Sequence, residues 1–150
     1  MNRRVPPPVA FAMAAIAMWW IGSSFEIGHY PLAYRTVVGI ALIVAGLVIV
    51  AISLRSFAVA GTTPNPMQPN KASELVTSGI YSISRNPMYV GDAIMLAGIA
   101  VWVGSVLDLA PLAIFIAYID RFQIAAEEQA LAMIFGDHYA AYCRRVRRWL

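Results

Sequence analysis

The chain has 150 residues, of which 60% are hydrophobic and 13% are charged, and its mean hydropathy is +0.66. Soluble domains carry about 25% charged residues, so this composition indicates an integral membrane protein with a single domain, residues 1–150. The net charge is +3, but the chain lacks the long basic face of a nucleic-acid-binding protein, which argues against that function. The single cysteine, Cys143, excludes an internal disulfide and a metal site of several thiolates.

Two hydrophobic stretches in the first third of the chain each predict a transmembrane helix. Residues 9–25 follow a basic start and contain two adjacent tryptophans, which suit the membrane interface better than a signal-peptide cleavage site. We therefore expect this stretch to be a retained span. Residues 36–54 are almost entirely aliphatic or glycine, and at about 1.5 Å per residue they can cross a hydrocarbon core about 30 Å thick.

Two further spans follow the longest connection, residues 56–87, in which prolines and asparagines predict extended or turning backbone. The third span, residues 88–106, begins after Pro87, and proline is favoured in the first turn of a helix because its missing N–H would be unbonded there. A turn at Asp108 separates it from the fourth span, residues 109–124. These two spans are expected to form a helical hairpin.

The C-terminal tail, residues 127–150, predicts an amphipathic helix at the membrane surface, which Gly136 interrupts. Apolar residues recur at spacings of three to four and so mark one face of that helix. They are Leu131, Ile134, Phe135, Tyr139 and Tyr142. The basic run 144–148 is interpreted as an electrostatic anchor to lipid headgroups.

The basic residues are distributed asymmetrically in a model with four spans. Only Arg35 falls on one side. The other basic residues all fall on the opposite side, and they are Arg3, Arg4, Arg55, Lys71, Arg85, Arg121, Arg144, Arg145, Arg147 and Arg148. By the positive-inside rule, both termini, the long connection and the tail are cytoplasmic. The predicted fold is an all-α integral membrane bundle of about four transmembrane helices, with a cytoplasmic loop and a C-terminal amphipathic helix.

Two polar clusters fall on that cytoplasmic side and can form a site for a charged ligand beside lipid. Arg85 can hold a carboxylate or phosphate, and Glu127 or Glu128 can accept hydrogen bonds from an amine or from ribose hydroxyls. Tyr81 and Tyr89 offer aromatic faces for a base or a cation. S-adenosylmethionine carries all of these groups. A nucleotide or a phospholipid headgroup also fits the residue chemistry.

Simpler interpretations of the same residues stay open at this point. Arg85 can be a topological anchor whose guanidinium reaches the headgroups, and Glu127 and Glu128 can be charges that favour the start of a helix. Asp92, just inside the third span, should face the bundle or a wet cavity. The two histidines are isolated in the sequence, so no metal site is predicted.

The residues of both clusters resemble one known family. The pattern G-x-Y-x-x-x-R-[HN]-P-x-Y-x-G is present at residues 79–91, and E-E-x-x-L-x-x-x-F-G-x-x-Y-x-x-Y at residues 127–142. They are similar to motifs of the isoprenylcysteine carboxyl methyltransferases and the related phospholipid methyltransferases. The motif-bearing half of the chain is residues 73–150.

The resemblance implies a membrane-embedded methyltransferase that uses S-adenosylmethionine and receives a lipid-like or prenylated substrate from the bilayer. The implied cofactor-binding residues are Ser73, Glu74, Leu75, Val76, Tyr81, Arg85, Asn86, Pro87, Met88, Tyr89 and Glu127. The implied catalytic residues are Arg85, Glu128 and Arg121. Asn86 replaces a histidine that is common in the eukaryotic members of the family, and it keeps the ability to donate and accept hydrogen bonds.

One departure from the family pattern concerns the acceptor. Gln123 stands where the carboxyl methyltransferases are expected to have an arginine for the substrate carboxylate. Arg121 is two residues away, which rotates its side chain by about 200° on a regular helix, so it can substitute only if the helix is distorted. A carboxylate acceptor needs no base, whereas an amine must lose a proton, for which Glu128 or Asp92 is available.

Three functions are therefore carried forward. The first is carboxyl O-methylation of a prenylated thiol compound or a similar lipid-like acid. The second is N-methylation of a phospholipid ethanolamine headgroup. The third is a small membrane scaffold that contacts lipid headgroups and has no affinity for S-adenosylmethionine. The sequence does not indicate an oligomeric state.

Overall fold

The computed structural model describes residues 5–25, 33–62 and 74–150. Within them the regular elements are helical, apart from one isolated bridge between Ser84 and Arg147. The elements in chain order are α1 (Pro7–Ser24), α2 (Arg35–Val59), the 3₁₀ helix η2 (Gly79–Ser82), α3 (Pro87–Val103), the 3₁₀ helix η3 (Val106–Asp108), α4 (Leu109–Tyr118), the π-helix η4 (Ile119–Ile124) and α5 (Ala125–Arg145). The all-helical prediction is confirmed.

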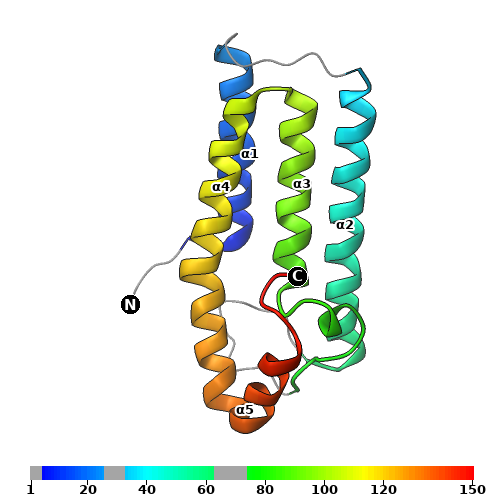
Figure 1. Cartoon of the computed structure of the whole chain (residues 1–150), viewed down its shortest axis with the longest axis vertical. Helices are drawn as coiled ribbons and strands as arrows, with labels where there is room; N and C mark the ends of the chain where they lie inside the picture. Colours follow the sequence, from blue (N-terminus) through cyan, green and yellow to red (C-terminus); the bar gives the residue numbers. More distant parts are fainter. Residues whose placement is uncertain (1–4, 26–32, 63–73) are drawn as a thin grey trace.

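The four helices α1 to α4 run side by side along the length of the molecule, and α5 lies at one end of this bundle (Figure 1). α3 occupies an inner position, with α2 packed along one side of it and α1 and α4 on the other. α1, α2 and the continuous helical run Val106–Arg145 are each long and apolar enough to cross a membrane, and α3 is a shorter apolar helix. The chain is therefore a membrane bundle of the predicted kind.

The fourth span continues directly into the predicted tail helix. The span was predicted to end near residue 124 and the tail helix to begin at residue 127, whereas α4, η4 and α5 follow one another without interruption. The interruption comes later, at Gly136, whose φ of 48° and ψ of −121° lie outside the helical region. These angles confirm the predicted break at Gly136. Glycine adopts them without the steric penalty of a Cβ, and the break lets α5 fold back on itself.

Glycine also determines how closely α2 and α3 approach. A Cβ built on Gly46 would lie 2.5 Å from the carbonyl oxygen of Gly91, and one on Gly98 would lie 2.7 Å from that of Gly39. These distances leave no room for any side chain. Small residues allow this close backbone packing between membrane helices, where lipid provides little hydrophobic drive for association.

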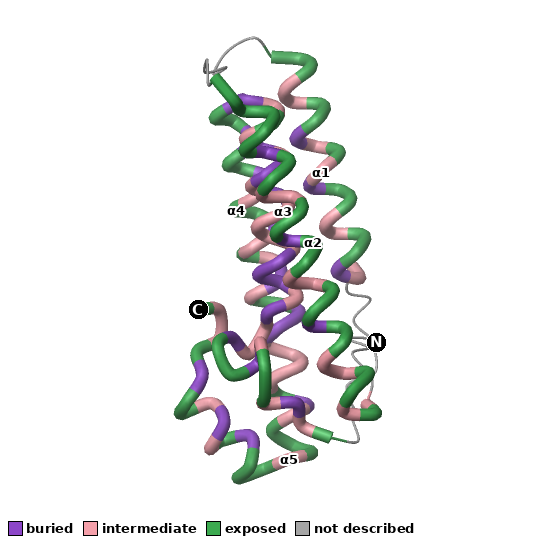
Figure 2. The backbone as a smooth tube through the Cα atoms, turned by 90° about the vertical axis from the view of Figure 1, so that its right-hand side faces the viewer, coloured by how far each residue is buried: buried purple, intermediate pink, exposed green. Residues whose placement is uncertain are grey.

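Apolar side chains form an interior and also cover the outside of the bundle. Met18, Leu96 and Ile119 are fully buried in the centre, between α1, α3 and η4. Long stretches of α1 and α2 are exposed along their outer faces (Figure 2), where Trp19 is 68% and Val37 is 65% exposed. An exposed apolar surface of this extent is expected where lipid, and not water, is the solvent.

The tail has most of the predicted apolar face. Tyr139 and Tyr142 are buried, and Leu131 and Phe135 pack against them. Ile134 is the exception, since it is 40% exposed. Helical spacing predicted a single face, whereas the bend at Gly136 gives the two parts of α5 different directions.

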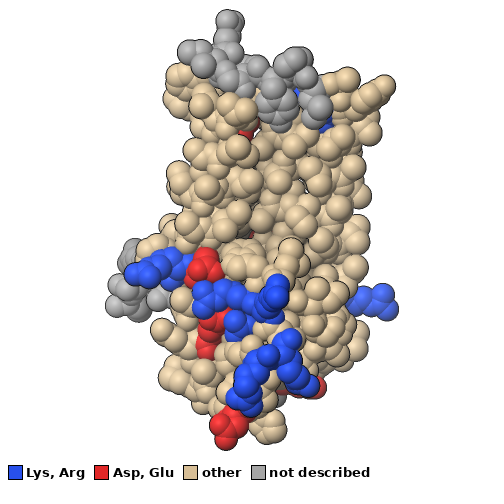
Figure 3. Space-filling model, viewed as in Figure 1, with Lys and Arg blue, Asp and Glu red and all other residues tan. Residues whose placement is uncertain are grey.

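Charged side chains gather at the end of the bundle that holds α5, and the surface along the helices above is almost free of them (Figure 3). Arg35 belongs to the opposite end, where its Nη1 donates to the carbonyl oxygen of Val103 at 3.4 Å. The charge asymmetry expected from the sequence is thus present among the described residues. Which side of the membrane the charged end faces stays a prediction.

Candidate active site

A cavity of about 380 Å³ lies at the charged end of the bundle. α1, α2, α3, α5 and the connection before α3 all contribute to its wall. The lining residues are Pro7, Pro8, Phe11, Val50, Phe57, Glu74, Leu75, Val76, Tyr81, Arg85, Asn86, Met88, Tyr89, Asp92, Glu127, Glu128, Leu131, Tyr139 and Tyr142. The volume lies within the range of about 300–1,000 Å³ that is typical of small-molecule sites.

The connection 74–86 forms one wall of the cavity, and the turn at η2 fixes its course. Gly79 enters this turn with a positive φ of 60°, and Tyr81 follows with its side chain buried. The Tyr142 hydroxyl donates a hydrogen bond to the carbonyl oxygen of Tyr81 at 2.6 Å, and the Phe57 ring packs edge-on against the Tyr81 ring. Burial, and to a smaller extent the neighbouring Tyr142 and Glu127, raise the pKa of the Tyr81 phenol, so Tyr81 is a neutral wall residue at physiological pH.

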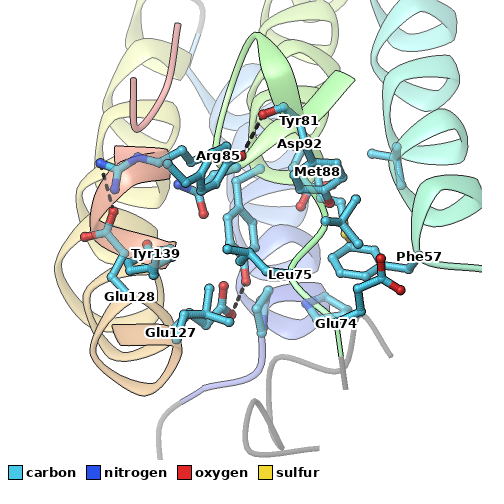
Figure 4. Close-up of a pocket in the computed structure, with 18 of the residues that line it drawn as sticks. Phe57, Glu74, Leu75, Tyr81, Arg85, Met88, Asp92, Glu127, Glu128 and Tyr139 are labelled. Carbon is cyan, nitrogen blue, oxygen red and sulfur yellow. Dashed lines mark hydrogen bonds and ion pairs between the residues drawn. The ribbon is translucent and has the colours of Figure 1, made fainter. Parts of the chain in front are cut away.

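Arg85 projects from the end of this connection into the cavity wall (Figure 4). Its side chain is only 14% exposed, so it is not a surface anchor that extends into the headgroups. Nη2 pairs with Glu128 Oε1 at 3.1 Å, and Nη1 donates to the sulfur of Cys143. Its Nε is buried and has no hydrogen-bond partner among the described residues. A buried guanidinium with donor capacity to spare can hold an anionic ligand group.

Glu127 is held in place by two hydrogen bonds to one of its oxygens. The Tyr89 hydroxyl and Gln123 Nε2 each donate to Oε1 at 2.7 Å. Gln123, the residue that departs from the family pattern, is buried. Its hydrogen bond helps to orient Glu127. Glu128, the next residue, faces Arg85, while Phe57 and Glu74 lie across the cavity (Figure 4).

Most residues implied by the resemblance line this one cavity, although they come from separate parts of the chain. They are Glu74, Leu75, Val76, Tyr81, Arg85, Asn86, Met88, Tyr89, Glu127 and Glu128. Pro87 is buried at the first position of α3 and starts that helix beside the cavity. Ser73 lies outside the described residues.

Arg121 lies elsewhere. The helix distortion that Arg121 would need is present, because residues 119–124 form the π-helix η4. Arg121 is nevertheless exposed, and it is not among the residues that line the cavity. The arrangement therefore offers no support for a catalytic role of Arg121.

Several cavity residues were not assigned to the site from the sequence. Tyr139 and Tyr142 were interpreted as packing residues, although their places in the second motif were a usable signal. Asp92 lines the cavity, as expected of a carboxylate that must avoid lipid. No local sequence pattern marked the residues of α1 and α2 that line the cavity, since these helices are uniformly apolar.

The last residues of the chain pack against the cavity wall. The backbone N–H of Arg85 donates to the carbonyl oxygen of Arg147 at 3.0 Å, and Asn86 Nδ2 donates to that of Arg148 at 2.9 Å. The basic run 144–148 was interpreted as a lipid anchor. The Arg148 side chain instead bonds to Glu128 and Asp120 of the protein. The hydrogen bond to Glu128 is the largest cause of a raised pKa of Arg148, and partial burial opposes it.

Comparison with known proteins identifies methyltransferases. A family described as phospholipid methyltransferase matches residues 34–138. The chain is 30% identical over 145 residues to a protein named protein-S-isoprenylcysteine O-methyltransferase from Xenopus laevis, and the match covers 91% of this chain and 48% of that protein. A protein of the same name from Schizosaccharomyces pombe is 34% identical over 77 residues, which cover 51% of this chain and 33% of that protein.

A third relative is shorter. An uncharacterized protein from Haemophilus influenzae is 43% identical over 63 residues, which cover 42% of this chain and all of that protein. The chain spans about half the length of the Xenopus methyltransferase and about a third of the Schizosaccharomyces one. No solved structure matches the chain.

Proposed function

Because the chain belongs to the phospholipid methyltransferase family, we propose that this integral membrane protein transfers a methyl group from S-adenosylmethionine to a lipid-like acceptor. The observation that carries the proposal is the cavity in which Arg85 and Glu127 meet aromatic and apolar walls at the end of a membrane bundle. Such a position gives access to a polar ligand from water and to an apolar one from lipid.

The polar residues of the cavity suit S-adenosylmethionine. Arg85 would hold its carboxylate, because its guanidinium is buried and its Nε has no partner among the described residues. Glu127 would accept hydrogen bonds from its ammonium or its ribose hydroxyls. Tyr81, Tyr139 and Tyr142 supply aromatic faces for the adenine and for the positive sulfonium.

The bound S-adenosylmethionine supplies an activated methyl group on a sulfonium. The residues of the chain then contribute mainly position and the exclusion of water. Phe11 and Val50 contribute apolar surface from α1 and α2 to the wall of the cavity. Tyr89 and Gln123 keep Glu127 in one orientation, so the site needs little rearrangement when a ligand binds.

The first candidate acceptor is the carboxylate of a prenylated thiol compound or a similar lipid-like acid. Both named relatives are called protein-S-isoprenylcysteine O-methyltransferase, which supports this class. A carboxylate is already ionised at neutral pH and requires no base. Arg121 is not part of this proposal, because it is exposed and outside the cavity.

A second candidate acceptor is an amine such as an ethanolamine headgroup. Among the described lining residues Arg85 is the only cation, and it is assigned to the cofactor, so no second cation remains there for an acceptor carboxylate. Asp92 lines the cavity from α3 and can take the proton that an amine must lose. Both oxygens of Glu128 already bond to guanidinium groups, which makes it a poorer proton acceptor than Asp92.

We place the cavity on the cytoplasmic side, because the basic residues gather at that end of the bundle. Titration of the detergent-purified protein with S-adenosylhomocysteine tests the cofactor half of the proposal. Saturable binding at micromolar ligand is expected. Undetectable binding at millimolar ligand would favour the membrane scaffold.

A further inference from the structure

The last residues of the chain, 146–149, form a short strap across the site. Ser84 and Arg147 pair as an isolated bridge, and the backbone of Arg85 and the side chain of Asn86 bond to strap carbonyls. Trp149 Nε1 donates to Asp120 Oδ1 at 2.9 Å and fixes the end of the strap to η4. The strap therefore joins the connection before α3 to the π-helix before α5.

We infer that Arg148, which does not line the cavity, is a positioning residue that keeps Arg85 available to the cofactor. This inference rests on the proposed function. Arg148 Nε and Nη2 both donate to the Glu128 carboxylate, and Nη1 donates to the two oxygens of Asp120 at 3.3 and 3.2 Å. All three nitrogens of this guanidinium thus bond to protein carboxylates.

The consequence for Arg85 follows from how Glu128 is shared. Oε1 of Glu128 contacts Arg85 Nη2 at 3.1 Å and also accepts from Arg148 Nε at 3.2 Å. With two guanidinium groups on one carboxylate, the positive charge of Arg85 is only partly neutralised. Without Arg148, Glu128 would pair with Arg85 alone, and the positive charge offered to an anionic ligand would fall.

A lipid anchor would have a different environment. Arg144, Arg145 and Arg147 belong to the same basic run and are exposed, as expected of side chains that reach headgroups. The Arg148 side chain is 37% exposed, and its guanidinium lies between two carboxylates of the protein. An arginine that bridges two carboxylates is not equivalent to a lysine, whose single ammonium cannot form the bidentate pair.

The test compares S-adenosylhomocysteine binding, by calorimetry in detergent, between the wild type and five variants, of which Glu128→Gln alone is the reference for the double variant. Arg148→Gln removes the charge, and Arg148→Lys keeps it without the bidentate geometry. Arg145→Gln is the control that removes one exposed charge from the same run. In the double variant Arg148→Gln with Glu128→Gln, the carboxylate that competes for Arg85 is absent as well.

Arg148→Gln is expected to weaken binding about tenfold, and Arg148→Lys to weaken it several-fold, while Arg145→Gln leaves it unchanged. The double variant should bind as Glu128→Gln does, because Arg148 acts through Glu128. In the transfer assay, Arg148→Gln should raise KM for S-adenosylmethionine and leave kcat at saturation within about twofold.

Wild-type affinity in Arg148→Lys, or equal losses in Arg148→Gln and Arg145→Gln, would overturn the positioning role while leaving the proposed function intact. A lower Tm of the ligand-free Arg148→Gln protein with unchanged affinity would show that Arg148 is only structural. If Arg148→Gln does not fold, the Arg148→Lys comparison decides alone. Absence of binding by the wild type would instead overturn the proposed function itself.

Discussion

At the scale of single residues, the site is a set of buried polar groups that hold one another in place. Arg85 is paired with Glu128 and contacts Cys143, and Glu127 is fixed by Tyr89 and Gln123. Polar groups at the edge of lipid are costly unless they are paired or bind a ligand. Truncation of one member therefore affects the site directly, because each of its partners loses a bond.

Arg85→Ala and Glu127→Ala are each expected to weaken S-adenosylhomocysteine binding by about 30-fold or more, since each removes a charged contact in a desolvated cavity. Calorimetry in detergent measures this loss. Arg55→Ala is the matched control, because Arg55 is exposed near the end of α2. Wild-type affinity in both cavity variants would mean that the cofactor binds elsewhere.

Asp92→Asn separates the two acceptor classes. If the acceptor is an amine, loss of the proton acceptor should reduce methyl transfer by about 100-fold or more. If the acceptor is a carboxylate, transfer should persist at a similar rate, because no proton is removed. Asp137→Asn, at an exposed position of α5, is the control. Loss of cofactor binding in Asp92→Asn would assign Asp92 to the cofactor and contradict both expectations.

The sequence predicted which segments lie close together where the motifs are local. Residues 79–91 and 127–142 carried their own signal, and the two segments do meet at one cavity. The role of Arg148 had no such signal, since a basic run beside a span looks the same whether it faces headgroups or two carboxylates. The position of Arg121 was equally unpredictable, because the rotation of η4 depends on packing around a π-helix.

At the scale of elements, the bend in α5 matters most for the site. It carries the chain from Glu127 and Glu128, in the first part of the helix, back to Tyr139 and Tyr142, which also line the cavity. The break was predictable because glycine interrupts the apolar pattern. The continuity of α4, η4 and α5 was not predictable, since a polar pair such as Glu127 and Glu128 can either start a helix or lie within one.

Gly136→Ala tests the bend. With a φ of 48° and ψ of −121° an alanine would be strained by about 1–3 kcal/mol, so the second part of α5 should lose its position. We expect a lower Tm of the ligand-free protein and weaker S-adenosylhomocysteine binding. Ala132→Gly, at an exposed position in the first part of α5, is the control for a general change in helix propensity. Unchanged Tm and affinity in Gly136→Ala would contradict a role for the bend.

At the scale of the whole molecule, hydrophobic length and charge predicted the spans and their asymmetry but not their arrangement. Uniformly apolar helices carry little information about their neighbours, so the inner place of α3 had to come from the structure. The glycines of α2 and α3 are the exception, since their spacing leaves a strip along which two backbones can touch. The contribution of α1 to the cavity depends on this arrangement.

The orientation of the bundle can be tested in intact cells with single cysteines. In a Cys143→Ser background, Tyr34→Cys lies near the end of the bundle opposite the cavity and Met133→Cys lies on α5, and both native side chains are 79% exposed. An impermeant maleimide should label Tyr34→Cys in intact cells and Met133→Cys only after the membrane is opened. The reverse pattern would place the cavity on the outer side.

The transfer of a labelled methyl group is the direct measurement of the proposed methyltransferase activity. Purified protein would be incubated with methyl-labelled S-adenosylmethionine and a total lipid extract supplemented with a farnesylated cysteine analogue. We expect label in the organic phase with the wild type, and none above background with Arg85→Ala or Glu127→Ala. The fraction that carries the label identifies the acceptor class. No transfer by a folded wild type that also fails to bind S-adenosylhomocysteine would contradict the proposal.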